Sequence, residues 1–219
     1  MNSIGYKLTT QELTTHNDFQ WEVGKPIKTS GKGGLCSKGW LHYYEHPLLA
    51  VLHNSTHAAI GNPRLWECSV GEKIKRDGFM KAGTTDLTIV REVVLPVLTT
   101  EQRVEYAIRC ALAVYEDDRF VKWANAWLSG EDRTEESAAQ AATEAEVAAR
   151  CAAAAAAAYS AAEAAAELAA EAEAYSAAES AAARWAAEAA LWATEACAKD
   201  VDLLKIVLTV CPNYQIEYV

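Results

Sequence analysis

The chain has 219 residues, with 30 Asp and Glu against 20 Lys and Arg and a formal net charge of −10. That length allows one sizeable domain with an appendage. The acidity is concentrated, because residues 131–199 contain thirteen acidic and four basic residues while the rest is nearly neutral. Such a segment argues against direct binding of nucleic acid or anionic membranes by that part, since neutralising phosphates requires Lys and Arg.

The cysteines and the N-terminal sequence indicate the compartment. The cysteines stand singly rather than in C-x-x-C pairs, which fits reduced thiols better than a disulfide framework or a zinc site. They are Cys36, Cys68, Cys110, Cys151, Cys197 and Cys211. The N-terminus has no apolar signal-peptide core, and no stretch contains the roughly eighteen apolar residues of a membrane span. We therefore expect a cytoplasmic protein that does not enter a membrane.

The first half of the chain predicts short strands and one early helix. Residues 6–10 and 19–23 are rich in aromatic and β-branched residues and are predicted strands, although the second could begin a short helix. Residues 30–34 predict a flexible turn rather than a phosphate-binding loop, because the G-x-x-x-x-G-K-[ST] pattern is absent. Residues 35–44 have strand character, and Pro47 then begins a helix that continues to Leu52.

The middle of the chain changes from strand to helix patterns. Residues 64–70 alternate as a half-buried strand does, a charged turn is predicted over residues 71–78, and residues 87–95 form the strongest strand pattern. Thr99 and Gln102 match a capping box. Apolar residues at three- and four-residue spacing after it predict an amphipathic helix. A second short helix is predicted over residues 118–128.

Residues 134–199 contain neither Gly nor Pro and are dominated by Ala, the strongest helix former. As one rod they would extend roughly 100 Å at 1.5 Å per residue, so the segment protrudes, folds back as a hairpin, or packs against another copy. A heptad test gives one apolar series, but the matching series contains Arg150, Glu171 and Lys199, so no coiled-coil seam is predicted. Residues 201–208 are apolar, and residues 214–219 are predicted to return to the sheet as a terminal strand.

Four histidines form two pairs spaced by four residues, His42 with His46 and His53 with His57. On a helix this spacing places zinc ligands on one face. Pro47 argues against a shared helix for the first pair, and the sequence offers the second pair no clear third ligand. We therefore assign no metal site and expect surface or capping roles.

The acidic helical segment, called here the arm, contains the candidate partner-binding residues. Glu163, Glu167 and Glu171 share one helix face, where like charges four residues apart repel by a few tenths of a kcal/mol. A basic partner would relieve that repulsion, and the alternative is a solvated face. Trp185 and Trp192 also share a face, either as binding hot spots or as packing against the rest of the protein.

Four stretches within residues 6–130 resemble a family of uncharacterised domains found in phages and prophages, in which an Ala-rich helical tail often follows. The stretches are Leu35-Cys36-Ser37-x-Gly39-Trp40-Leu41-His42, Pro47–Leu52, Asn62-Pro63-Arg64-Leu65-Trp66-Glu67 and Thr99–Arg103. The resemblance implies a phage protein in the cytoplasm of a host cell and implies no particular activity.

A second resemblance rests on the order of the elements. A Tyr6-Lys7-x-Thr9 strand, Trp21, a Gly39–His42 strand, a helix, a Leu65–Glu67 strand and a strand with Arg91-Glu92 are similar to small ADP-ribosyltransferase-like domains. This resemblance implies a nucleotide cleft with NAD as cofactor. The cleft residues would be Tyr6, Lys7, His42, Tyr43 and Glu92, with His42 and Glu92 as catalytic candidates. The chain departs from that pattern in having Lys7 on the first strand and Tyr43 after the histidine.

We therefore predict an α+β protein with three parts. Residues 1–130 form a head with a small mixed sheet of five or six strands and two or three helices, residues 131–199 form the arm, and residues 200–219 return to the head. The leading hypothesis is a phage accessory protein that binds a host protein with a basic groove, such as a defence component, without catalysis or cofactor. The alternatives are an ADP-ribosyltransferase-like nucleotide-binding protein or enzyme, and a structural protein that forms homo-oligomers through its helix.

Overall fold

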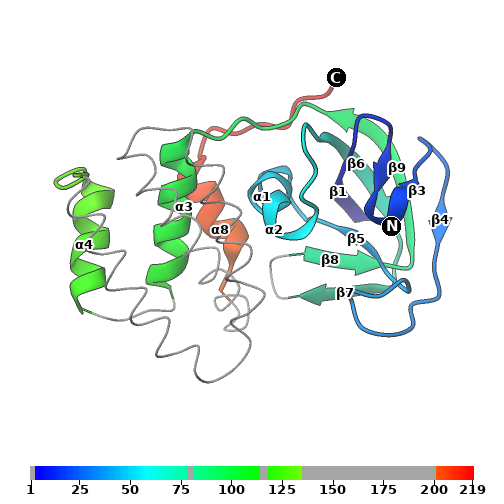
Figure 1. The fold of residues 1–219 in the computed structure, drawn as a ribbon, viewed down its shortest axis with the longest axis horizontal. Coiled ribbons are helices and arrows are strands. Elements are labelled where there is room, and N and C mark those ends of the chain that lie inside the picture. Colours follow the sequence, from blue (N-terminus) through cyan, green and yellow to red (C-terminus); the bar gives the residue numbers. More distant parts are fainter. Residues whose placement is uncertain (1–2, 78–80, 114–117, 135–200) are drawn as a thin grey trace. The chain divides into compact units, whose positions relative to one another are not determined.

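The structure, a computed structural model, describes residues 3–77, 81–113, 118–134 and 201–219 (Figure 1). It divides into two compact units, one formed by Met1–Val97 with Asp202–Val219 and the other by Leu98–Val201. We call the first the head unit and the second the helical unit. The head predicted from sequence is residues 1–130, whereas the sheet-containing unit consists of Met1–Val97 and Asp202–Val219. Pro96 has no N–H for a sheet ladder, and the chain beyond it enters helices.

The larger sheet of the head unit has four strands in the order β1-β6-β9-β4. Its pairings are all antiparallel. The register shifts between Glu67 and Cys68, where a bulge interrupts the ladder between the second and third strands. The strands are β1 (Ser3–Thr9), β6 (Arg64–Val70), β9 (Asp86–Val93) and β4 (Ile27–Lys28).

The smaller sheet has the order β5-β8-β7, and a two-stranded ribbon joins β2 to β3. Tyr6 and Tyr44 exchange backbone hydrogen bonds of 2.8 and 2.7 Å, which connect β1 to the residue after β5. The α+β class is confirmed, with the strands distributed over three sheets. The strands are β5 (Leu41–Tyr43), β8 (Lys81–Thr84), β7 (Ile74–Asp77), β2 (Thr14–Thr15) and β3 (Phe19–Gln20).

The turn predicted over residues 71–78 is wrong in its second half, because Ile74–Asp77 is strand β7. Its sequence, Ile-Lys-Arg-Asp, has one apolar residue and therefore no strand-like alternation. As the last strand of its sheet, β7 exposes Lys75 and Arg76 to solvent. Charged residues are well tolerated on such edges and oppose edge-to-edge aggregation.

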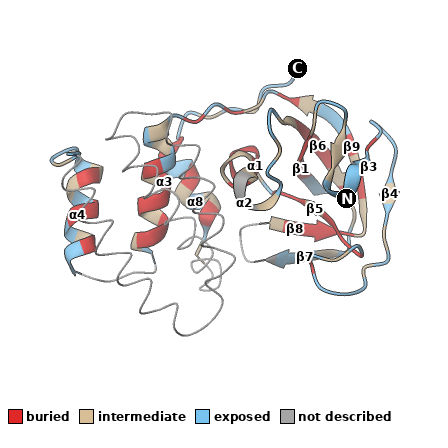
Figure 2. Ribbon diagram, in the orientation of Figure 1, coloured by how far each residue is buried: buried red, intermediate tan, exposed pale blue. Residues whose placement is uncertain are grey.

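The two faces of the larger sheet differ in what covers them. Leu8, Leu65 and Val93 form a buried cross-strand row, and helix α1 (Pro47–Leu52) packs on β1 and on helix α8 (Leu203–Val210). The other side contributes to one buried apolar cluster that also contains residues of the smaller sheet (Figure 2). The cluster consists of Trp21, Leu41, Tyr43, Trp66, Cys68, Val70, Ala82, Leu87 and Ile89.

Gly5 marks where β1 approaches this cluster most closely. A Cβ atom at Gly5 would lie 2.3 Å from Cδ2 of Tyr43, so a side chain there would push the two sheets apart. Side chains on a strand alternate between its two faces. Lys7, two residues further along β1, therefore projects toward the same interior as Gly5.

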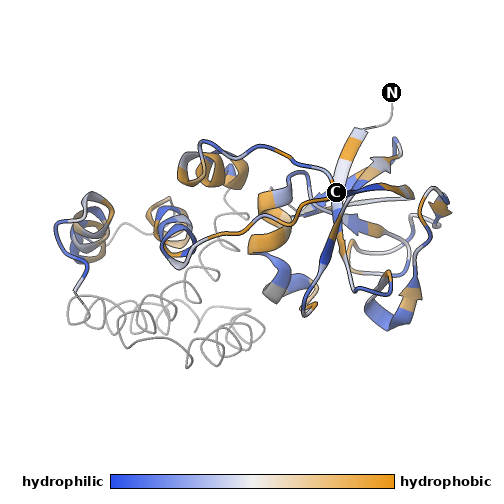
Figure 3. Ribbon diagram, turned by 90° about the horizontal axis from the view of Figure 1, so that it is seen from above, coloured by the Kyte–Doolittle hydropathy of each residue, from blue (hydrophilic) through white to orange (hydrophobic). Residues whose placement is uncertain are grey.

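The helices of the described residues follow their sequence signals. Pro47 lies in the first turn of α1, and α2 (Asn54–His57) follows it. In the helical unit, the capping box predicted at Thr99 and Gln102 is present at the start of α3 (Thr100–Leu112). Helix α4 (Asp118–Ser129) packs on α3, and both combine hydrophobic with hydrophilic residues (Figure 3). A short 3-10 turn occupies His16–Asp18.

The arm cannot be compared with its prediction, because residues 135–200 lie outside the described part. The partner-binding candidates Glu163, Glu167, Glu171, Trp185 and Trp192 fall in that segment. Among the described residues, no helix is long and apolar enough to cross a membrane.

The C-terminal segment returns to the larger sheet through an isolated bridge, and not as the strand predicted over residues 214–219. Val94 N donates to Glu217 O at 2.8 Å, and Tyr218 forms an isolated bridge with Val93. The hydroxyl of Tyr218 donates to Glu67 at 2.7 Å, and Arg91 donates to both oxygens of the same carboxylate at 3.0 Å. Burial raises the pKa of Glu67, but these hydrogen bonds outweigh it and the net shift is downward.

Candidate functional site

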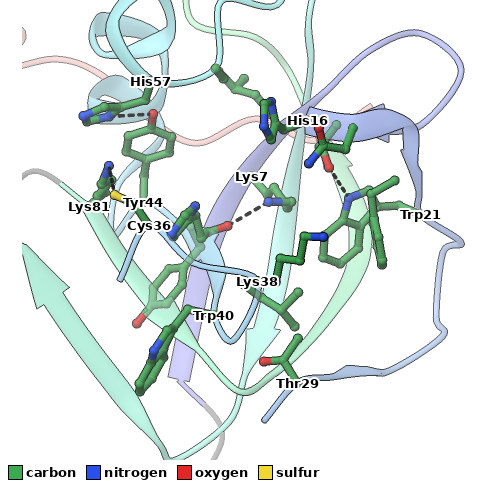
Figure 4. Close-up of a pocket in the computed structure, with 18 of the residues that line it drawn as sticks. Lys7, His16, Trp21, Thr29, Cys36, Lys38, Trp40, Tyr44, His57 and Lys81 are labelled. Atoms are coloured by element: carbon green, nitrogen blue, oxygen red, sulfur yellow. Dashed lines mark hydrogen bonds between the residues drawn. The ribbon is translucent and has the colours of Figure 1, made fainter. Parts of the chain in front are cut away.

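A pocket of about 1110 Å³ opens in the head unit (Figure 4). Its volume is slightly above the range of about 300–1,000 Å³ that is usual for small-molecule sites. Lys7 of β1 and residues 41–44 of β5 and its extension contribute to it, and Lys81 of β8 lies at one side. The other lining residues come from β1, β2, β3, the 3-10 turn between β2 and β3, loops and the end of α2. They are Leu8, Thr15, His16, Asn17, Phe19, Trp21, Thr29, Cys36, Ser37, Lys38, Trp40, His57, Ala58 and Ile60.

The loop over residues 29–40 forms one wall and is closed by contacts of its own backbone. The carbonyl of Gly39 accepts hydrogen bonds from Thr29 Oγ1 at 2.7 Å and from Gly31 N at 2.9 Å. A Cβ atom at Gly39 would lie 2.1 Å from the carbonyl oxygen of Lys32, so only glycine permits this crossing. The closed loop presents Lys38 and its neighbours to the pocket.

An aromatic wall stands beside Lys7. The indole nitrogen of Trp21 donates to Thr15 Oγ1 at 2.9 Å, and Phe19 meets the Trp21 ring edge-on with centroids 5.2 Å apart. Asn17, between them in the chain, has a left-handed φ of 58° that turns the backbone back toward the pocket. These contacts fix the orientation of the Trp21 ring.

Lys7 is a half-buried cation without a carboxylate partner. Its Nζ donates to the carbonyl oxygen of His42 at 2.8 Å and lies 4.8 Å from the centroid of the Trp21 ring. No ion pair links Lys7 to an Asp or Glu within the described residues, and the pocket lining contains no carboxylate. Burial therefore lowers the pKa of Lys7 to about 8.

The whole lining is positively charged or neutral. It includes three lysines and three histidines but no Asp or Glu. Lys38 is exposed, and Lys81 Nζ donates to the Cys36 thiol at 3.4 Å. Several cations elsewhere in the head unit are paired, as Lys25 is with Glu22 and Arg76 with Glu45. Lys7, Lys38 and Lys81, which form no ion pair among the described residues, thus give the pocket a field that attracts anions.

The pocket histidines His42 and His57 are held neutral. His42 Nε2 lies 2.6 Å from the carbonyl oxygen of Leu35. A carbonyl only accepts, so Nε2 carries the proton and Nδ1 is left as an acceptor. Burial lowers the pKa of His42. His57 Nδ1 lies 3.1 Å from the hydroxyl of Tyr44, and burial lowers the pKa of His57 to about 3.

The structure brings together three of the five residues assigned to the nucleotide cleft. Lys7, His42 and Tyr43 line the pocket, whereas Tyr6 and Glu92 do not. Tyr6 precedes Lys7 on the strand and projects to the opposite face, near Glu67. The carboxylate of Glu92 accepts hydrogen bonds of 2.8 and 2.5 Å from the guanidinium of Arg64.

Lys38, Lys81, Tyr44 and His57 line the pocket but were not predicted from the sequence as site residues. Nothing in their local sequence marks them, because strand pairing and loop closure bring them to Lys7. Of the paired histidines, His46 accepts the N-cap hydrogen bond of α1 from Leu48 N, His53 is buried, and His42 and His57 line the pocket. Within the described residues, no group of three His, Cys, Asp or Glu side chains could hold a metal ion.

We expect stability to fall between about pH 6.5 and pH 4. Burial lowers the pKa of His53 to about 4 and that of His57 to about 3, both below the value of about 6.5 of an unfolded histidine. The unfolded chain therefore binds more protons in this window, and the free energy of unfolding decreases as the pH falls. Each histidine contributes up to about 1.4 kcal/mol per pH unit.

Urea denaturation at several pH values measures this slope. His57→Gln removes one of the two groups and should make the dependence shallower. An equally steep slope in the variant would contradict the assignment.

Lys7→Met should stabilise the protein. At neutral pH the folded state must keep the ammonium partly desolvated, so an apolar side chain of similar length removes that cost. The gain should be about 1–3 kcal/mol, within the range found when buried charges are replaced by apolar groups. It should shrink above about pH 8, where the folded protein releases the Lys7 proton. Chemical denaturation measures the difference, and a loss of stability in Lys7→Met would show that the contacts of Lys7 outweigh its desolvation.

One family model matches part of this chain. Residues 3–101 match a domain of unknown function, DUF7666. No curated protein and no solved structure is similar enough to this chain to count as a match. All residues that line the pocket lie within the matched range. The pocket therefore belongs to the part of the chain that is similar to this domain of unknown function.

Proposed function

We propose that the head unit binds an anionic small molecule with an aromatic ring, and that a nucleotide is the class of ligand that fits best. The observation that carries this proposal is the composition of the pocket, with three lysines and three histidines but no carboxylate. A site of this composition has no negative charge to repel an anion, and its lysines can be neutralised by one.

The aromatic residues support the nucleotide class. Phe19, Trp21 and Trp40 line the pocket together with the lysines. Nucleobases stack on such rings, and base–aromatic stacking contributes about 1–3 kcal/mol per base. Lys73 and Lys75 lie 5.6 and 5.9 Å from the Trp40 ring centroid and extend the positive charge beyond the pocket. Phosphates would lie against lysines while the base lies against the rings.

The geometry favours binding over ADP-ribosyl transfer. The late glutamate that the resemblance assigns to catalysis, Glu92, is held by Arg64 and does not line the pocket. Trp66 stands between Lys7 and Glu92 in the cross-strand register. Without a carboxylate at the site, the pocket residues supply positive charge, neutral imidazoles and aromatic surface, which suffice for recognition.

Calorimetric titration of the full chain with ATP, ADP, NAD and adenosine tests this function. We expect the phosphate-bearing ligands to bind and adenosine to bind at least about tenfold more weakly, since each tenfold factor is 1.4 kcal/mol of binding free energy. Lys38→Ala with Lys81→Ala should weaken binding by a similar factor. Lys25→Ala is the matched control, because Lys25 is exposed, paired with Glu22 and outside the pocket.

Two results would contradict the proposal. One is that no phosphate-bearing ligand binds. The other is that Lys25→Ala weakens binding as much as the pocket variants do, because the attraction would then come from the overall charge and not from this site.

The arm supports a second proposal, which rests on its charge. We propose that the acidic arm of a phage protein binds a basic surface of a host protein in the host cytoplasm. The concentration of thirteen acidic and four basic residues in residues 131–199 favours this role. Reversing Glu163, Glu167 and Glu171 to Lys should abolish capture of proteins from host lysate. Capture of the same proteins by the variant would contradict it.

A further inference from the structure

Lys7 differs from the other lysines of the pocket in where its amine lies. Lys38 is exposed and Lys81 contacts the Cys36 thiol. Lys7 instead projects from β1 toward the apolar cluster between the sheets, and its amine contacts a backbone carbonyl and an aromatic ring. Figure 4 shows it in the middle of the pocket, between Trp21 and the residues around Tyr44.

We propose that Lys7 is a reactive amine that forms an imine with the carbonyl carbon of an anionic aldehyde or ketone held in this pocket. The inference rests on the proposed function in so far as the same cationic pocket receives the ligand. It goes beyond that function by adding a covalent bond to a defined atom, Nζ of Lys7.

The surroundings of Lys7 match what makes a lysine nucleophilic. A lysine forms imines readily when apolar neighbours or another cation favour its uncharged form. Here the amine is desolvated beside the apolar cluster between the sheets, and the pocket contains no carboxylate to hold the proton. With a pKa of about 8, roughly a tenth of the Lys7 amine is uncharged at pH 7. An ordinary lysine is uncharged in less than about one part in a thousand at that pH.

The reaction is balanced without an oxidant or reductant. The lone pair of Nζ attacks the carbonyl carbon, a C–N bond forms, and the carbonyl electron pair moves to oxygen. The nitrogen loses a proton and the oxygen gains one, giving a carbinolamine that then loses water as the C=N bond forms. Amine and carbonyl compound thus give imine and water. Water carries the proton from nitrogen to oxygen, and the neutral imidazole of His42 lines the same pocket.

Reductive trapping of the full-length protein tests the inference. Pyridoxal 5′-phosphate is a suitable probe because it combines an aldehyde, an aromatic ring and a phosphate. It is added near neutral pH at low stoichiometry with sodium cyanoborohydride, and the labelled residue is identified by peptide mass spectrometry. We expect Lys7 to be labelled at least about tenfold faster than the exposed Lys25 and Lys28, because more of its amine is uncharged.

A control variant separates the reactivity of the Lys7 amine from its positive charge. Lys7→Arg keeps the positive charge but cannot form an imine, so it should lose the fast label while Lys25 and Lys28 react as before. Should this variant fail to fold, the peptide map of the unsubstituted protein still decides. Labelling spread evenly over the lysines, or fastest at Lys38 or Lys81, would overturn the inference.

The result is distinguishable from failure of the proposed function. Nucleotide binding without a fast label at Lys7 overturns only the covalent step. A fast label at Lys7 in a protein that binds no nucleotide supports the reactive amine and contradicts the nucleotide class.

Discussion

The head unit is organised around a charge placed beside an apolar interior. Gly5 lets β1 approach Tyr43, and the alternation of the strand then directs Lys7 to the same side. A buried ammonium loses hydration that only an anion or strong dipoles can replace. The His42 carbonyl and the Trp21 ring replace part of this hydration. Among the described residues, no carboxylate pairs with Lys7. The pocket therefore keeps a positive charge that the protein does not neutralise and that an anionic ligand can neutralise.

The ion pairs elsewhere in the head unit sharpen this contrast. The head unit contains twelve Lys and Arg and eleven Asp and Glu, so it has enough acids to pair most of its bases. Glu92 is taken by Arg64, Glu67 by Arg91 and Tyr218, and Glu45 by Arg76. The arginines thus pair with several of the carboxylates of this unit. At Glu67 and Glu92 the guanidinium donates to both carboxylate oxygens, the bidentate geometry that suits arginine. Lys7, Lys38 and Lys81 form no ion pair among the described residues and can interact with an anionic ligand.

The sequence predicted the parts of the fold that depend on local pattern. The alternation in β6 and β9, Pro47 at the start of α1 and the capping box of α3 are all local signals, and each element is present. Strand β7 was missed because an edge strand with one apolar residue has no alternation to detect. The division into three sheets depends on pairings between distant residues, which no local pattern records.

The candidate site was only partly predictable for the same reason. Lys7 and His42 were assigned through a resemblance. Which of two neighbouring residues faces the pocket depends on the geometry of the strand. Because side chains alternate, Tyr6 and Lys7 lie on opposite faces of β1 and cannot share one cleft. Lys81 reaches the pocket through the pairing of β8 with β5. The pairing of Glu92 with Arg64 joins residues 28 positions apart on neighbouring strands.

The protonation of Lys7 tests the account most directly. In a protein with isotopically labelled lysine side chains, an NMR titration follows the Cε resonance of Lys7, assigned by its absence from Lys7→Arg. The account predicts a midpoint of about 8. A midpoint near the ordinary lysine value of about 10.4 would show that the amine is hydrated or paired, and would contradict both the unmet charge and the reactive amine.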